Sequence, residues 1–347
     1  MINVITIWGW TWSYNLLTAL KNIPNINLSC IVTMSDDGGS TWRIRDEYWV
    51  LPPGDLRRAI VALSDDEKTE ILRKIFNHRF EWGSLDGHNL WNLIMMALEQ
   101  ITDNNWKAID MLEELFDIKW KVYPSTFEKT RLLAKLENLD YVIWETNIDI
   151  PKHDPNIKIQ DIYVVKEEYV SVLEKINSEK WISHHIIESI YEKFLQDKPS
   201  QNPEINSVIE SADYIIFAPW DLYTSILPNI LVGNISSVIA NSNAKKLLFV
   251  NLFTKYWETT GFNLSNFIQT FEKYFNKDIF DTIFFQDWDK YSIDQSILDK
   301  YKDENKTLVK DDLNDSRLIK ADFIKQNDMI RHDSQKIKDV LENFLSN

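Results

Sequence analysis

Short apolar runs alternate with helical stretches along the first half of the sequence, and each run ends in a polar turn. The runs 2–7 (INVITI) and 28–34 (LSCIVTM) have the unbroken, β-branched character of strands that are buried on both faces of a parallel sheet. A helical pattern at 14–22 separates them. Strand, turn, helix and strand in this order form a right-handed βαβ unit. The alternation therefore predicts an α/β fold.

The same alternation continues along the chain. We expect helices near 55–63, 89–100 and 107–116, and strands near 120–123, 141–144, 159–165, 213–218 and 246–252. The tail from about residue 290 is rich in lysine and aspartate and is expected to be helical. The sequence thus predicts a Rossmann-like, doubly wound, mainly parallel sheet in a domain over 1–290, with a helical insertion at about 166–211 and a charged helical extension over 291–347.

Charge and cysteine content narrow the class of protein. The chain has 38 basic and 53 acidic residues, a net charge of −15, which argues against binding to nucleic acids or to anionic membranes. Cys30 is the single cysteine and suits a reducing cytosol. No stretch approaches the ~20 apolar residues that span a bilayer. We expect a cytoplasmic protein without membrane insertion and without a nucleic-acid partner, either monomeric or homo-oligomeric.

Two polar turns follow the first two strands. The turn at 8–15 contains Gly9 and Thr11, and it lies where a helix N-terminus can bind a phosphate group. Asp36 and Asp37 end the second strand, and their carboxylates suit Mg²⁺, ribose hydroxyls or the role of a base. The residues that follow them suit a phosphorylated ligand: Gly38, Gly39, Ser40, Arg43 and Arg45. The alternative is a pair of ordinary turns in which the aspartates cap a helix.

Further polar turns are predicted on the same side of the sheet. Gly54 lies in the turn 51–55, which opens a helix, and the glycine-rich turn 83–89 brings His88 and Asn89 to a helix N-terminus, with Asn92 one turn later. Asn251 follows the strand at 246–250. The turn 219–225 follows another strand and contains Tyr223, Thr224 and Ser225. Their convergence predicts a binding site, although His88 could also serve only as a cap.

These residues together resemble the gluconeogenesis factor family (YvcK-like), within the wider CofD-like superfamily that includes 2-phospho-lactate transferases. The matching residues span 2 to about 265 and comprise 36–40 with Arg43 and Arg45, 51–57, 87–90 with Asn92, 222–229, and 251–252 with Thr254, Glu258 and Gly261.

The resemblance implies a Rossmann-like cytoplasmic protein that binds a UDP-sugar or an NAD(P)-type dinucleotide and regulates carbon metabolism, the cell envelope and cell shape. By the same resemblance, the ligand contacts are Gly9, Thr11, Asp36, Asp37, Gly38, Gly39, Ser40, Arg43, Gly54, His88, Asn89, Asn92, Tyr223, Thr224, Ser225 and Asn251. No catalytic residue is implied for this branch. Two alternatives stay open: a phosphoryl- or nucleotidyl-group transferase with Asp36 as Mg²⁺ ligand or base, and an inactive scaffold.

The sequence departs from the resemblance at one type of residue. The chain has only 8 glycines and as many as 14 tryptophans. Eleven tryptophans, hereafter the motif tryptophans, stand where the resemblance implies glycine: Trp8, Trp10, Trp12, Trp42, Trp49, Trp82, Trp91, Trp120, Trp144, Trp220 and Trp257. Because a glycine turn that admits a pyrophosphate has no room for indoles, we expect a blocked ligand site. The alternative is an indole platform that stacks on a uracil or nicotinamide ring.

Overall fold

A computed structural model describes residues 1–9, 11–36, 53–64, 70–71, 74–76, 78–86, 88–102, 104–150, 154, 156–178, 184–291, 293–326 and 329–346. Its strands are β1 (Ile2–Ile7), β2 (Ile26–Val32), β3 (Lys121–Pro124), β4 (Thr130–Leu136), β5 (Tyr141–Ile143), β6 (Ile159–Lys166), β7 (Tyr214–Phe217), β8 (Lys245–Phe249), β9 (Thr282–Gln286), β10 (Leu318–Ala321), β11 (Ile324–Gln326) and β12 (Ile330–His332).

The α-helices among these residues are α1 (Thr11–Lys21), α3 (Pro53–Leu63), α5 (Leu90–Thr102), α6 (Asn105–Leu115), α7 (Glu145–Asp149), α8 (Glu167–Ser178), α9 (His184–Gln196), α10 (Ile205–Glu210), α11 (Leu227–Leu231), α12 (Ile235–Asn241), α13 (Leu264–Phe275), α14 (Gln295–Asp303) and α15 (Ser334–Leu345). Shorter turns of helix are η1 (Gly83–Leu85), the π-helical η2 (Leu222–Ile226) and η3 (Trp288–Lys290).

The central sheet has seven strands in the order β10-β9-β8-β7-β1-β2-β3. The pairs β1–β7, β7–β8, β8–β9 and β9–β10 are all parallel. In the β1–β7 pair, Ile7 lies opposite Phe217, so the two strands end at the same level. This order and direction confirm the predicted Rossmann-like, mainly parallel sheet.

The chain divides into two compact units. The first unit comprises residues 1–30, 204–226 and 234–347, and the second comprises 31–203 and 227–233. β2 begins in the first unit and ends in the second. The division at residue 290 stays a prediction; residues 291–347 contribute the edge strand β10 to the central sheet.

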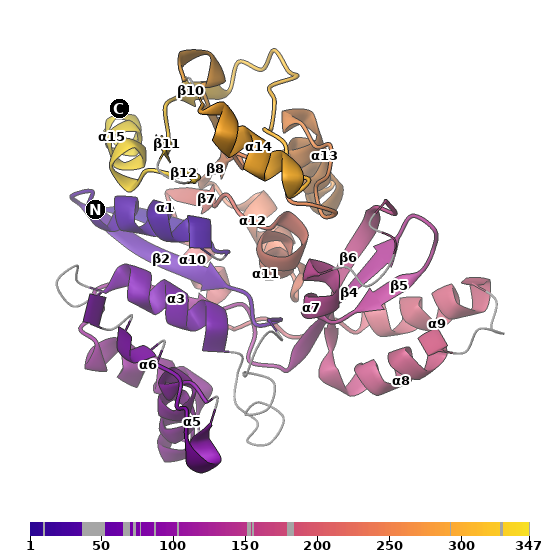
Figure 1. Ribbon diagram of the computed structural model, residues 1–347. Helices are drawn as coiled ribbons and strands as arrows, with labels where there is room; N and C mark the ends of the chain where they lie inside the picture. Colours follow the sequence, from indigo (N-terminus) through magenta and orange to yellow (C-terminus); the bar gives the residue numbers. More distant parts are fainter. Residues whose placement is uncertain are drawn as a thin grey trace. The chain divides into compact units, whose positions relative to one another are not determined.

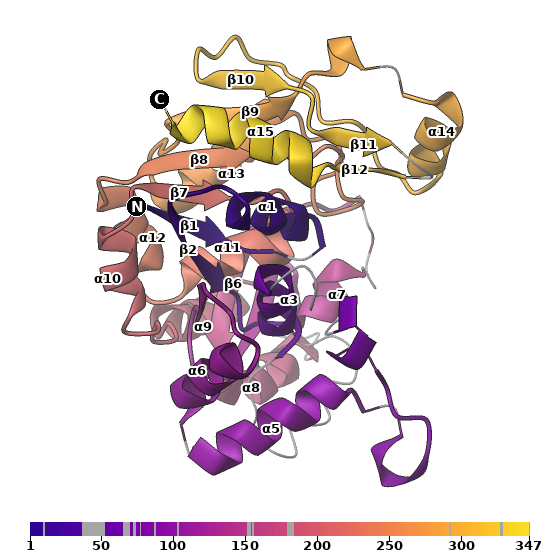
Figure 2. The same cartoon turned by 90° about the vertical axis from the view of Figure 1, so that its left-hand side faces the viewer.

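Helices cover both faces of the sheet in the first unit. α1 packs beside α15 on one face, and α12 packs beside α13 on the other (Figures 1 and 2). Aromatic side chains of the sheet pack against helices on both faces. The ring centroids of Phe217 of β7 and Phe271 of α13 are 5.2 Å apart, and those of Phe284 of β9 and Phe344 of α15 are 5.4 Å apart. Alternate side chains of buried parallel strands thus meet the two helical layers.

The second unit holds a separate antiparallel sheet of order β5-β4-β6. α8 and α9 pack against it through a cluster in which Tyr141 stacks on Tyr191 at 4.0 Å. Arg131 of β4 is fully buried, and its guanidinium pairs with the Glu167 carboxylate at 2.8 Å. A buried arginine needs such a partner to offset its lost hydration.

Most of the predicted elements are present in the structure. The strands expected at 2–7, 28–34, 120–123, 141–144, 159–165, 213–218 and 246–252 correspond to β1, β2, β3, β5, β6, β7 and β8, with ends shifted by up to three residues. β4, β9, β10 and the hairpin β11–β12 were not predicted, and the last three of these strands lie in the tail that was expected to be helical. Among the described helices, none by itself combines the length and apolar character needed to cross a membrane; the bent pair Leu222–Leu231 and Ile235–Asn241 meets those criteria only jointly.

Candidate functional site

The strand order reverses between β1 and β7. From β1 the chain continues outward through β2 to β3, and from β7 it continues in the opposite direction through β8 and β9 to β10. The Ala218 amide donates to the Ile7 carbonyl at 3.3 Å, which holds the carboxyl ends of the two strands together. In open α/β sheets this reversal is where ligands bind.

Gly9 lies at this reversal, and its backbone is closely covered. The Gly9 amide donates to the Ser13 hydroxyl of α1 at 3.2 Å. A Cβ atom added at Gly9 would lie 2.9 Å from both the Trp220 Cβ and the Ile226 Cδ1, which is too close for an ordinary contact. The bare backbone of Gly9 is therefore in contact with Trp220, one of the motif tryptophans.

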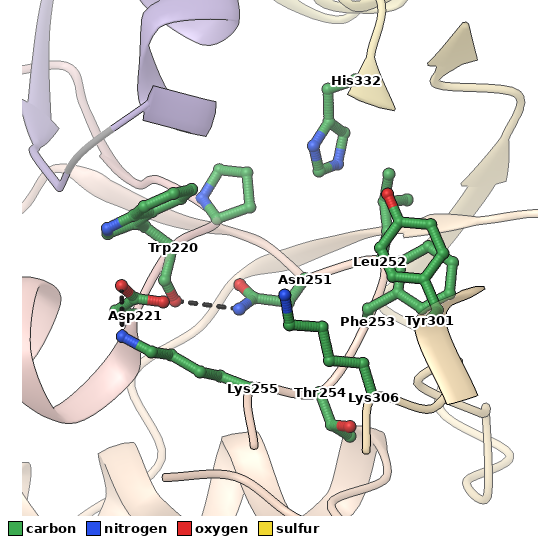
Figure 3. A pocket seen from close by; sticks show the side chains of 11 residues that line it. Trp220, Asp221, Asn251, Leu252, Phe253, Thr254, Lys255, Tyr301, Lys306 and His332 are labelled. Atoms are coloured by element: carbon green, nitrogen blue, oxygen red, sulfur yellow. Dashed lines mark hydrogen bonds and ion pairs between the residues drawn. The ribbon is translucent and has the colours of Figure 1, made fainter. Parts of the chain in front are cut away.

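A cavity of about 200 Å³ lies beside Trp220, within the first unit. Its walls combine aromatic, amide and cationic side chains (Figure 3). The lining residues are Pro219, Trp220, Asp221, Asn251, Leu252, Phe253, Thr254, Lys255, Tyr301, Lys306 and His332. The loops after β7 and β8 supply most of them, as expected for polar turns at the carboxyl ends of parallel strands.

An ion-pair network fixes the floor of this cavity. The Lys255 ammonium pairs with the Asp221 carboxylate at 2.7 Å and with the Glu258 carboxylate at 2.9 Å. Glu258 is buried and also accepts from the Thr224 hydroxyl at 2.9 Å and from the Tyr223 amide at 3.1 Å. One lysine thus joins the loop after β8 to the loop after β7.

Residues far along the chain complete the cavity. The Val309 amide donates to the Leu252 carbonyl at 3.0 Å, and this places the segment after α14 against the loop after β8. Tyr301 of α14 stacks on Phe253 at 4.0 Å. Lys306 follows in the same segment, and its ammonium pairs with the exposed Glu304 carboxylate at 2.6 Å. A lysine paired with an exposed carboxylate can turn toward an anion in the cavity.

His332 ends β12 and forms the remaining wall. The side-chain amide of Asn15 in α1 donates to the His332 carbonyl at 2.8 Å, and Asp333 caps the following helix α15 by accepting from two backbone amides. Burial lowers the pKa of the His332 imidazole to about 3, so the ring is neutral at physiological pH. A neutral imidazole offers one donor and one acceptor.

A second group of predicted site residues lies at the start of α3, in the second unit. A Cβ atom on Gly54 would contact the Asp36 carboxylate, so Asp36 lies against the first turn of the helix. Burial lowers the pKa of Arg57 to about 10. Repulsion from Arg58 contributes to this lowering of the pKa, whereas attraction to Asp36 opposes it. Burial also lowers the pKa of Arg58, opposed first by Asp55 and then by Asp36. The two arginines and two aspartates form one charged cluster.

His88, Asn89 and Asn92 lie at the start of α5, also in the second unit. The Asn89 side-chain oxygen accepts from the Trp91 amide at 2.9 Å, which is a capping contact. Asn89 and Asn92 are buried, and His88 is partly exposed. Their role in ligand binding stays a prediction.

The structure divides the predicted site residues between the two units. Gly9, Tyr223, Thr224, Ser225 and Asn251 lie at the carboxyl ends of β1, β7 and β8, but only Asn251 lines the cavity. Tyr223, Thr224 and Ser225 are buried in η2 behind it. The predicted residues Asp37, Gly38, Gly39, Ser40 and Arg43 lie outside the described residues, as does the side chain of Thr11.

Asn251 is the one lining residue that was predicted as a ligand contact; those missed include Asp221, Lys255, Tyr301, Lys306 and His332. Asp221 belongs to the turn 219–225, and Lys255 lies three residues before Glu258, so both had a local signal in the polar loops. No such local signal exists for Tyr301, Lys306 and His332. Their place in the cavity wall depends on contacts between segments that are far apart in the sequence.

Comparisons with known proteins show the family and the fold of this chain. Residues 4–329 match the protein family described as "2-phospho-L-lactate transferase CofD". A "Putative gluconeogenesis factor" from Thermotoga maritima is 32% identical, with 98% of each chain covered, and a "Gluconeogenesis factor" from Bacillus subtilis is 31% identical, covering 95% of this chain and 94% of that one. A crystal structure of a member of the upf0052 family from Bacillus halodurans has a TM-score of 0.80 at 29% identity, covering 98% of this chain and 99% of that one. The chain therefore belongs to the CofD family, together with relatives that are named gluconeogenesis factors.

Proposed function

We propose that this protein binds a nucleotide-type ligand, a UDP-sugar or a dinucleotide, as a non-catalytic cytoplasmic regulator of carbon metabolism and of the cell envelope. The observation that carries the proposal is the cavity beside the reversal of strand order, because it joins aromatic surfaces to lysines. The names of the gluconeogenesis factor relatives support the proposed role in carbon metabolism.

The chemistry of the walls suits the parts of a nucleotide. The ring of Tyr301 offers a face on which a base or nicotinamide ring can stack. Lys306 offers positive charge to a phosphate, and Asn251 offers an amide that can read a base edge. Selectivity in this site would come from the amide, and affinity from stacking and charge.

The size of the cavity limits how much of the ligand it holds. Pockets for whole ligands measure roughly 300–1,000 Å³, whereas this cavity measures about 200 Å³. The remainder of a UDP-sugar would lie along the Gly9 turn, where a phosphate could approach bare backbone and the N-terminus of α1. Trp220 lies against that turn, so in our proposal its indole takes the place of a phosphate group.

Replacing Trp220 with glycine tests this proposal. We expect the Trp220→Gly variant to bind UDP-glucose at least ~10-fold more tightly than the unchanged chain, since a ~1.4 kcal/mol gain is enough for that factor. Isothermal titration calorimetry measures it. Trp106→Gly is the matched control, because Trp106 stacks on Tyr123 in the second unit, and it should leave the affinity unchanged.

Two outcomes would count against the proposal in different ways. Tight binding of UDP-glucose by the unchanged chain would show that Trp220 does not block the site. Failure of both UDP-glucose and NAD⁺ to bind a variant with glycine at positions 8, 10, 12 and 220 would reject the ligand class.

Group transfer with Mg²⁺ is the second candidate, favoured by the description of the matching family. Asp36 is its predicted metal ligand or base. The described residues fit an ion-pair cluster better than a Mg²⁺ site, because Arg57 and Arg58 lie within electrostatic range of both Asp36 and Asp55. We therefore derive no step through the metal. Release of a nucleotide from a nucleotide-linked donor, lost on Asp36→Asn substitution, would favour this candidate over a binder.

A further inference from the structure

Two tryptophans have backbone conformations that favour glycine. Trp144 has φ 83° and ψ 130°, and Trp257 has φ 66°. An L side chain at positive φ crowds its own backbone, whereas glycine adopts this region freely. Trp144 also lies close to the region of φ/ψ space that is populated almost only by glycine.

The other positive-φ residues in the described part of the chain make the two tryptophans stand out. Besides three glycines, they are Asn25, Asp117, Leu139, Asn276 and Asn305. Asparagine and aspartate are the residues that tolerate this region best. Trp106 and Trp288, the described tryptophans outside the motif set, do not have positive φ. Leu139, at φ 70°, is the one other bulky residue in this set, and among the described tryptophans positive φ occurs at motif positions alone.

A third motif tryptophan occupies space at a glycine-type turn. Trp220 follows β7 at the reversal of strand order and lies against the bare Cα of Gly9. Turns at this place in Rossmann-like sheets use glycine so that backbone can approach a bound group. Trp220 does not have positive φ, so this observation is independent of the first.

The composition shows the same substitution across the chain. Eight glycines in 347 residues are few, since glycine ordinarily accounts for ~7% of residues. Reading the motif tryptophans as glycine would leave three tryptophans and nineteen glycines. The shortage of glycine and the excess of tryptophan then disappear together.

We propose that the motif tryptophans are glycines in the protein that its own cells synthesise. One codon with two translations accounts for the whole set, because UGA is read as tryptophan in some genetic codes and as glycine in others. The turns after β1 and β7 then present bare backbone that an anionic group can approach. This inference is independent of the proposed ligand, because its test determines which amino acid the protein contains at each position.

Tryptic peptides of the protein purified from its own cells give the direct test. The peptides 136–152 and 256–273 each contain one motif tryptophan, and we expect tandem mass spectrometry to read glycine at residues 144 and 257. Peptide 80–107 contains its own control: glycine is expected at residues 82 and 91, and tryptophan at Trp106. Peptide 278–290 should likewise keep Trp288. Tryptophan at residues 144 and 257 overturns the inference.

Thermal unfolding gives a second readout that does not depend on the natural source. A chain with glycine at residues 144 and 220 should unfold at a higher temperature than the present chain, because the strained backbone at residue 144 and the crowding against Gly9 are relieved and neither side chain is fully buried. Trp106→Gly and Trp288→Gly in that chain should each lower the melting temperature, since the Trp106 ring stacks on Tyr123 and the Trp288 indole donates to the Val309 carbonyl at 3.0 Å. A lower melting temperature for the glycine chain contradicts the inference, whether or not the chain binds UDP-glucose.

Discussion

Replacing Lys255 with methionine is expected to lower the free energy of unfolding by about 3–5 kcal/mol, the usual cost of removing one partner of a buried ion pair. The Lys255 ammonium pairs with two carboxylates, and the Glu258 side chain is fully buried at 2.9 Å from it. Without the lysine, that negative charge would remain in a site with little water. Urea-induced unfolding, followed by circular dichroism, measures the change.

Lys290→Met is the matched control. Lys290 and Asp287 form an ion pair with the same sequence separation of three residues, but the lysine is 76% exposed. Surface pairs contribute about 0–1 kcal/mol, so this variant should be nearly as stable as the unchanged chain. The double variant Lys255→Met/Glu258→Gln removes both charges and should recover part of the lost stability. Equal stability losses at Lys255 and Lys290 would show that the network does not support the cavity floor.

The stability of the protein is expected to fall between pH 6.5 and pH 5 because of His332. Burial holds the pKa of this imidazole at about 3 in the folded protein, whereas the unfolded value is near 6.5. Below pH 6.5 the unfolded chain therefore takes up a proton that the folded chain does not. Each pH unit in this window costs about 1.4 kcal/mol, hence about 2 kcal/mol from pH 6.5 to 5.

The measurement compares pH slopes rather than absolute stabilities. His332→Asn should remove the part of the slope that His332 causes, so the difference between the two chains changes by about 2 kcal/mol over this window. Hydrogen bonds from Lys290 and Arg317 lower the pKa values of Asp287 and Asp315, and these carboxyl groups lose their contribution at more acidic pH. Parallel plots of unfolding free energy against pH for the two chains would mean that folding does not lower the pKa of His332.

Local sequence could predict the central sheet because its strands are recognisable one by one. A buried parallel strand is a short, mainly apolar run, and β1, β7 and β8 each contain one. β4 was missed because Arg131 and Lys135 make it resemble a solvated segment. Its burial depends on partners outside the strand, such as Glu167, which the strand's own sequence does not reveal.

The sequence by itself determined which polar turns lie at the carboxyl edge of the sheet, because the edge follows from strand order and direction. Gly9, Asn251 and the turn 219–225 were found in this way. Only the tertiary structure decided that Lys255 joins two of these loops, and that Tyr301, Lys306 and His332 close the cavity. Their placement depends on contacts such as the Val309–Leu252 hydrogen bond, between residues 57 positions apart, for which no local pattern exists. Only the structure could also show that Trp144 and Trp257 have positive φ, because a sequence pattern does not give backbone angles. At positive φ a tryptophan is strained, whereas a glycine is not.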